Sequence, residues 1–126
     1  MKEQTLSRIA VIILAIVLIA FGIYHFLHPD NMIGYVPNFL PGGKIWVYLV
    51  GAAFIIVAIA LILHKRVKIA SYILAIILFS FVLLIHLPNY VNAGDIDLKQ
   101  QHLISILKDS AIAAFALYLA ANAQKI

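Results

Sequence analysis

Cysteine is absent from the 126-residue sequence, and charged residues are scarce. The absence of cysteine excludes disulfide bonds, thiolate metal sites, iron–sulfur ligation and dithiol redox chemistry by this chain alone. Only 11% of the residues are charged, whereas soluble domains carry about 25%. Hydrophobic residues make up 65% of the chain, too many for the core of a small soluble domain, which leaves about a third of its surface in water. The composition therefore excludes a soluble enzyme domain and a disordered tail, and it indicates an integral membrane protein.

The few charges also argue against a nucleic-acid partner, although the formal net charge is +4. Basic residues that bind nucleic acid form a continuous patch or stripe. Here they stand in short tracts beside apolar runs. We therefore expect no nucleic-acid binding, and we interpret the basic residues as determinants of membrane topology.

Four apolar runs are long enough to cross a membrane as helices, because one span takes about 20 residues. The runs lie at 6–27, 45–63, 67–87 and roughly 102–121. None of them alternates between polar and apolar residues, so helices are favoured over the strands of a membrane barrel. Short connections make neighbouring helices antiparallel. The sequence thus predicts a single domain over residues 1–126, an all-α integral membrane protein folded as an antiparallel four-helix transmembrane bundle.

Lysine and arginine residues near the ends of the spans predict the orientation, because they favour the cytoplasmic side. Six of them lie beside the termini or between the second and third spans: Lys2, Arg8, Lys65, Arg66, Lys68 and Lys125. The opposite side has Lys44 and Lys99, with Lys108 inside the fourth span. We therefore expect a multi-pass protein of the bacterial inner membrane with both termini in the cytoplasm.

The two outer connections differ in character. Loop 28–44 is rich in proline and glycine, yet it also holds six large apolar side chains: Met32, Ile33, Tyr35, Val36, Phe39 and Leu40. A purely solvated connector has no need of them, so we expect a loop, shaped by Pro37 and Pro41, that caps the outer side of the bundle. Loop 88–101 begins at Pro88, contains two aspartates and is predicted to be a more solvated connection.

Four polar side chains are predicted to share one depth below the outer surface. His25 and His86 lie near the outer ends of the first and third spans, and Lys108 and Asp109 lie roughly 8–10 Å below the start of the fourth. An ionisable side chain at mid-membrane costs at least about 2.5 kcal/mol, which makes it a candidate for function. We therefore take these four residues as the candidate ligand-binding set, without assigning a catalytic residue.

A quinone head group suits this set, because its carbonyl groups need hydrogen-bond donors and its reduction needs protons. Asp109 could accept a hydrogen bond from His86 or His25 and fix the tautomer of that ring. Lys108 lies about 100° around the helix from Asp109, so the two do not point at one spot without other partners. A small anion is a further ligand of suitable chemistry. The structural alternatives are snorkelling of Lys108, a packing hydrogen bond from Asp109, and histidines that lie at the interface.

Metal and haem sites are not predicted. His25 and His28 are three residues apart on a helix, which is compatible with metal binding, but Pro29 follows at once and no carboxylate completes the set. Histidines on two facing helices can ligate haem, but His86 follows bulky residues such as Phe81 where a haem needs a wide crevice. We therefore expect no covalently bound cofactor, and quinone as the only organic cofactor that the sequence favours.

Three segments resemble the DoxX-like family of small bacterial membrane proteins. They are FGIYHFLHPDNMIGYVPNFLP after the first span, HLPNYV at the end of the third and LKDSAIAAFAL in the fourth. The resemblance implies a four-helix membrane fold and a link to thiosulfate:quinone oxidoreduction or to redox defence. The matching positions in this sequence are His25, Pro37, Pro41, His86, Pro88, Lys108 and Asp109. The lack of cysteine departs from the thiol-active relatives and argues against a disulfide relay.

Three functions remain open from the sequence. The first is a membrane subunit that supports quinone-linked redox chemistry through a polar pocket near the outer leaflet. The second is a non-catalytic assembly partner of another membrane or redox protein. The third is a small transporter that acts as a homo-oligomer, which the scarcity of polar residues along the spans disfavours. In each case the lipid bilayer is the first partner, and whether the chain is an enzyme stays open.

Overall fold

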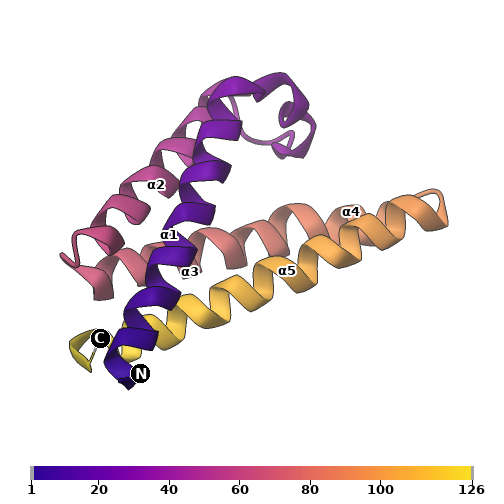
Figure 1. Ribbon diagram of the computed structural model, residues 1–126. Helices are drawn as coiled ribbons and strands as arrows, with labels where there is room; N and C mark the ends of the chain where they lie inside the picture. The colour runs from indigo at the N-terminus through magenta and orange to yellow at the C-terminus, as the bar shows by residue number, and fades with distance from the viewer. Residues whose placement is uncertain (1, 126) are drawn as a thin grey trace.

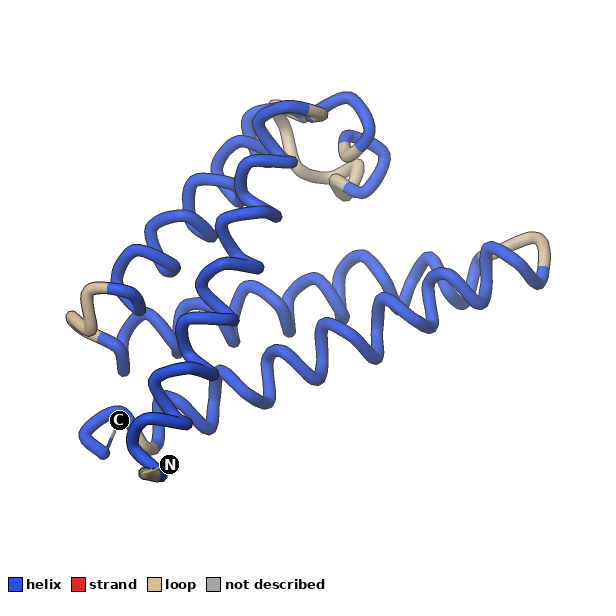
Figure 2. The backbone as a smooth tube through the Cα atoms, in the orientation of Figure 1, coloured by secondary structure: helices blue, strands red, loops and turns tan. Residues whose placement is uncertain are grey.

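The computed structural model describes residues 2–125, and this part of the chain is helical with no strand (Figure 2). The long helices are α1 Glu3–Leu27, α2 Lys44–Ile62, α3 Val67–Phe81 and α5 Ile96–Ala121. A π-helical segment, Val82–His86, joins α3 to the short helix α4 Leu87–Asn92. Within residues 2–125, four helical stretches are long and apolar enough to cross a membrane. The prediction of an all-α chain with four such stretches is confirmed.

The prediction that residues 88–101 form a solvated loop is wrong, because most of this segment is helical. The third span runs on through Pro88 to Asn92, and α5 begins at Ile96 rather than at His102. Asp95 caps the start of α5, since its side chain accepts the backbone N–H of Leu98 at 2.8 Å. An aspartate at this position satisfies a backbone donor that the helix itself leaves unpaired. Apolar composition marks the membrane-spanning part of a helix, whereas the cap marks its true beginning.

The helices form two antiparallel hairpins that approach each other at one end only. The helix α1 packs mainly on α2, and α3 with α4 packs on α5. Figure 1 shows the hairpins close together near the chain termini and separate toward loop 28–44 and the turn between α4 and α5. The buried core lies at the closed end, where Leu18, Leu61 and Leu74 are almost fully buried. The open end is the place where a cavity can form.

Small residues allow close helix packing in this core. Helical spacing predicts a packing stripe of Ala113, Ala116, Ala120 and Ala123 on the fourth span. The first three are buried on one face of α5, whereas Ala123 lies beyond the end of α5 and is partly buried against the core. Gly22 on α1 and Gly51 on α2 lie where the two helices of the first hairpin approach each other closely. A Cβ atom added to Gly22 would lie 2.8 Å from the backbone oxygen of Gly51, and one added to Gly51 would lie 2.8 Å from the Cβ of His25. The glycine contact therefore fixes the place of His25.

The π-helical segment has a local cause in Pro88. In a regular helix the proline ring would clash with the carbonyl group four residues earlier, at Leu84. The wider turn closes with the Leu87 N–H bonded to the Val82 carbonyl, five residues back, and it thereby adds one residue to the turn. His86 then occupies the position that residue 85 would have in a regular helix, one heptad after buried Leu78. The turn thus brings His86 to the face that packs on α5.

Candidate functional site

A cavity of about 470 Å³ lies between the two hairpins, and all four predicted site residues line it. His25 comes from α1, His86 from the π-helical segment, and Lys108 and Asp109 from α5. Most of the remaining wall is apolar, so the polar groups stand out in a hydrophobic surrounding. The sequence therefore grouped residues that the structure also brings together. The predicted depth of Lys108 is wrong, because α5 begins at Ile96 and Lys108 lies twelve residues after that start. That they bind a ligand stays a prediction.

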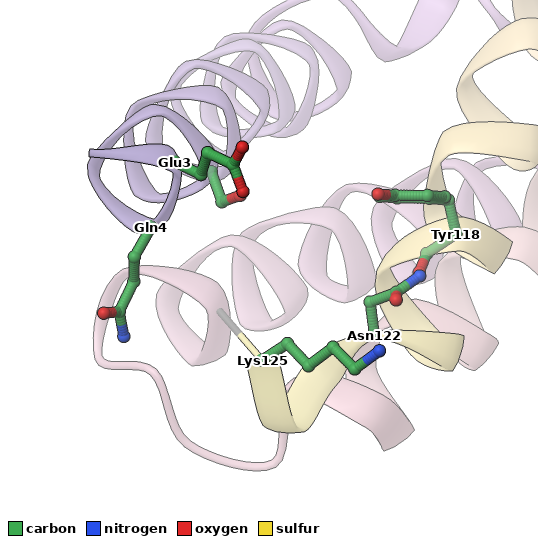
Figure 3. A pocket seen from close by; sticks show the side chains of 6 residues that line it. Glu3, Gln4, Tyr118, Asn122 and Lys125 are labelled. Carbon is green, nitrogen blue, oxygen red and sulfur yellow. The ribbon is translucent and has the colours of Figure 1, made fainter. Parts of the chain in front are cut away.

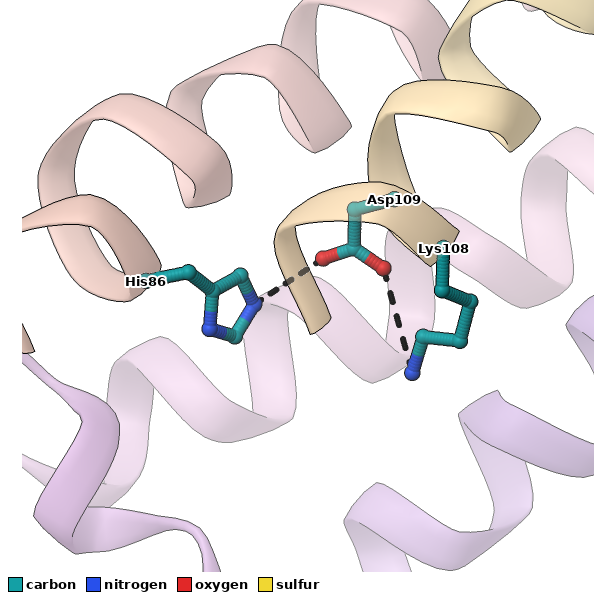
Figure 4. Close-up of polar contacts among 3 residues, drawn as sticks. All are labelled: His86, Lys108 and Asp109. Atoms are coloured by element: carbon teal, nitrogen blue, oxygen red, sulfur yellow. Dashed lines mark hydrogen bonds and ion pairs between the residues drawn. The ribbon is translucent and has the colours of Figure 1, made fainter. Parts of the chain in front are cut away.

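His86 and Asp109 form the central contact of the site. The Nε2 atom of His86 lies 3.0 Å from Oδ2 of Asp109, with the two side chains only 13% and 8% exposed (Figure 4). An ionised carboxylate only accepts hydrogen bonds, so Nε2 carries the proton and Nδ1 becomes the acceptor of the neutral ring. That Nδ1 atom is buried and has no hydrogen-bond partner within residues 2–125. Of the two pairings open to Asp109 from the sequence, the structure contains the one with His86.

Lys108 reaches back to the same carboxylate. Its Nζ atom lies 3.9 Å from Oδ1 of Asp109, as Figure 4 shows, and its side chain is half-exposed. The same Nζ atom lies 5.3 Å from the centre of the Phe21 ring, within the range of a cation–π contact. Lys108 and Asp109 leave the helix in different directions, but the long side chain of Lys108 bends so that its Nζ atom comes near the Asp109 carboxylate. The cavity therefore combines a cation, an anion and an imidazole.

His25 stands apart from this contact and is held by its own helix. Its Nδ1 atom lies 2.6 Å from the backbone oxygen of Phe21, and its ring meets the Phe54 ring edge-on with 5.6 Å between centres. A carbonyl oxygen only accepts, so Nδ1 carries the proton and Nε2 is the acceptor. The neighbouring His28 is exposed, and its ring lies tilted against that of Tyr24, with 4.8 Å between ring centres. The helical spacing of the two histidines therefore does not bring them to one site.

Loop 28–44 contributes one wall of the cavity. Four of the six apolar residues singled out from the sequence line the cavity: Met32, Tyr35, Val36 and Leu40. Pro37 lines it as well. The other two, Ile33 and Phe39, are exposed. Tyr35 reaches across to His86, with 6.3 Å between ring centres. Pro37 and Pro41 shape the loop through their carbonyl groups. The Pro37 oxygen accepts the Leu40 backbone N–H at 3.0 Å, and the Pro41 oxygen accepts the Trp46 indole N–H at 2.6 Å.

Several lining residues were not singled out from the sequence. Phe21 lies four residues before His25, and Ser105 lies four residues before Asp109. Both line the cavity. Residues four apart share a helix face, so this spacing could have identified them. Phe54 and Trp46 on α2 line it as well, but nothing in their local sequence distinguishes them from other apolar helix residues. Pro88 acts on the site through the π-helical turn that places His86.

A second recess lies at the opposite end of α1, beside the chain termini. It has a volume of about 390 Å³ and is lined by Glu3, Gln4, Ser7, Tyr118, Asn122 and Lys125. Figure 3 shows polar side chains from the two ends of the chain around it, which do not converge on one point. It contains none of the predicted site residues. The cavity between the hairpins is therefore the candidate functional site.

Comparison with known proteins gives one match. The model of a family described as a domain of unknown function (DUF8561) matches residues 14–120, which include every predicted site residue. No curated protein matches the chain, and no solved structure matches it.

Proposed function

The chain belongs to the DUF8561 family, and from that premise we propose that it is an inner-membrane protein that binds a quinone head group between its helical hairpins. In this proposal it supports quinone-linked redox chemistry, as the resemblance to the DoxX-like family implies. The observation that carries the proposal is the contact of His86 with Asp109 inside a largely apolar cavity, with the Lys108 ammonium group beside it.

The proposed orientation places the closed end of the molecule at the cytoplasmic side. The basic connection with Lys65, Arg66 and Lys68 lies at the same end as both termini and is largely exposed. Positive residues favour the cytoplasmic side of a membrane. The hairpins would then form an antiparallel four-helix bundle in the bilayer, with loop 28–44 capping its outer side and the cavity in the outer leaflet.

The polar groups of the cavity match the needs of a quinone. Its carbonyl oxygens accept hydrogen bonds, and the Lys108 ammonium group is a charge-assisted donor. The carboxylate of Asp109, 3.0 Å from Nε2 of His86, holds the imidazole ring in place in the cavity wall. The rings of Phe21 and Phe54 in the wall offer faces and edges to a flat head group. A volume of about 470 Å³ lies within the range of small-molecule sites.

The cavity also suits a ligand that arrives from the lipid. Its lining includes Ile76 and Leu84, which are 64% and 52% exposed. These side chains belong both to the cavity wall and to the apolar outer surface of the third span. A quinone dissolved in the bilayer would therefore enter sideways between the hairpins, with its isoprenoid tail left in the membrane.

The first test compares Lys108→Met with Lys99→Met. Methionine keeps much of the side-chain length but removes the donor. The control residue, Lys99, lies on the same helix, where its Nζ atom sits 4.7 Å from the Tyr90 ring centre and outside the cavity lining. A hydrogen bond from a charged donor is worth about 1.5–3 kcal/mol. We therefore expect Lys108→Met to weaken duroquinone binding at least about tenfold, and Lys99→Met to leave it unchanged.

The measurement uses the full chain purified in mild detergent. Binding of duroquinone is followed by quenching of Trp46, the one tryptophan of the sequence, which lines the cavity. Mass spectrometry of the purified protein is expected to find bacterial quinones in wild type and less in Lys108→Met. Absence of quinone together with no binding of duroquinone would overturn the proposal. Recovery of a stoichiometric membrane protein instead would favour the assembly function.

A further inference from the structure

The two histidines of the cavity have one property in common: each uses its ring N–H on a protein acceptor. Nδ1 of His25 lies 2.6 Å from the Phe21 backbone oxygen, and Nε2 of His86 lies 3.0 Å from the Asp109 carboxylate. A carbonyl oxygen and an ionised carboxylate accept hydrogen bonds and do not donate them. In their neutral forms both rings therefore present a lone pair on the remaining nitrogen. Neither ring offers the cavity an N–H donor.

The two remaining nitrogens differ in access. Nδ1 of His86 is buried within the protein, with no partner in the described chain, so it does not face a ligand in this conformation. In His25 the nitrogen near the backbone turns back to its own helix. His25 lines the cavity, and Nε2 is the ring nitrogen that the contact with Phe21 leaves unused. His25 Nε2 is thus the acceptor that a ligand can reach.

Lys108 lines the same cavity as His25. Its Nζ atom lies 5.3 Å from the centre of the Phe21 ring, and the backbone oxygen of Phe21 is the group that holds His25. His25 and Lys108 therefore contact the same residue, His25 at the backbone oxygen of Phe21 and Lys108 over its ring. One oxygen atom of a ligand near Phe21 could accept from Lys108 and, if it carries a hydrogen, donate to His25.

We propose that the cavity recognises the reduced, hydroxyl-bearing form of its ligand, a hydroquinone, through donation of a ligand hydroxyl to Nε2 of His25. The inference rests on the proposed quinone site and specifies which form that site prefers. A hydroquinone oxygen accepts from Lys108 and donates to His25, so both protein groups are satisfied. A quinone oxygen only accepts, and it leaves the His25 lone pair without a partner in an apolar pocket. The proposal concerns binding, and it includes no electron transfer.

The test measures two ligands on each protein sample: duroquinone and its reduced form, durohydroquinone. Binding is measured without oxygen at pH 8, where free imidazole groups are neutral. For wild type we expect durohydroquinone to bind about tenfold more tightly, the factor that corresponds to one neutral hydrogen bond. The ratio of the two affinities does not depend on the fraction of active protein, because both ligands are added to the same preparation.

The informative variant is His25→Phe, which keeps an aromatic ring against Phe54 and removes the acceptor. We expect its affinity for durohydroquinone to fall about tenfold and its affinity for duroquinone to stay the same or to rise. The matched control is His28→Phe. It makes the same substitution at the residue that ends the same helix, but His28 is exposed, lies with its ring tilted against that of Tyr24 and is outside the cavity lining. We expect this control to keep the wild-type ratio.

The outcomes separate the inference from the proposed function. Equal affinities for the two ligands in wild type, or tighter binding of duroquinone, would overturn the inference and leave the quinone site standing. The same holds if His25→Phe lowers both affinities by one factor, since that result indicates a structural role for the ring. If wild type binds neither ligand, the proposed quinone site itself is overturned.

Discussion

Replacement of Gly51 by alanine tests the contact that places His25. The added Cβ atom would lie 2.8 Å from the Cβ of His25 and 3.1 Å from the backbone oxygen of Gly22. Neither atom can rotate away, because a Cβ and a backbone oxygen move only when their helix moves. The helices α1 and α2 must therefore separate at this point. We expect the variant to be less stable than wild type, although alanine is the better helix former.

The magnitude follows from two opposing terms. Overpacking of a tight contact costs typically about 1–3 kcal/mol. Exchange of glycine for alanine inside a helix returns up to about 1 kcal/mol. A mid-range cost of about 2 kcal/mol less this return leaves a net loss of about 1 kcal/mol. Ligand binding should weaken as well, because His25 moves away with α1.

The assay is a denaturant titration in detergent micelles, followed by helical circular dichroism and by the fluorescence of Trp46. Gly94→Ala is the matched control, because a Cβ at Gly94 meets no atom within 4 Å. We expect the control to be as stable as wild type or slightly more so. If Gly51→Ala is also as stable as wild type, the close approach of α1 and α2 at this glycine is refuted.

Two further substitutions test other features of the fold. Asp95→Ala removes the side chain that accepts the Leu98 N–H, and the loss of such a cap costs about 1 kcal/mol. We expect a corresponding loss in the same titration and faster amide exchange at the start of α5, and unchanged exchange there would contradict the cap. Ser71→Ala removes a fully buried hydroxyl group whose oxygen has no partner within residues 2–125. We expect a neutral or stabilising effect on thermal unfolding, and a clear loss would show that the hydroxyl has a partner.

Much of the fold could be predicted from the sequence, because lipid imposes strong requirements on it. A span must be apolar, about 20 residues long and helical, and these requirements identify the four spans. They say nothing of a helix that continues beyond the lipid. The stretch 96–101 contains aspartate, lysine and glutamine, which are common in exposed helices, and only the cap at Asp95 marks where α5 begins. Solvated helix and solvated loop have similar compositions, so the boundary was misplaced.

The candidate site shows a similar division. The rise per residue gives depth along a helix, and depth alone selected the four polar residues that line one cavity. Depth does not give direction around the helix axis. Which histidine pairs with Asp109 depends on the π-helical turn before Pro88, which adds one residue and turns His86 toward α5. The sequence signals the proline, but it does not signal whether the helix bends, stops or widens there.

Because the hairpins are in contact at one end only, a small rotation at that end produces a large displacement at their far ends. A helix of 25 residues, such as α1, is about 37 Å long. A rotation of about 5° at the closed end therefore moves the far ends by about 3 Å, roughly the width of a water molecule. The core moves very little in such a rotation, whereas the distance between His25 on α1 and Lys108 on α5 changes directly. The width of the cavity can therefore change while the packed core at the closed end stays intact.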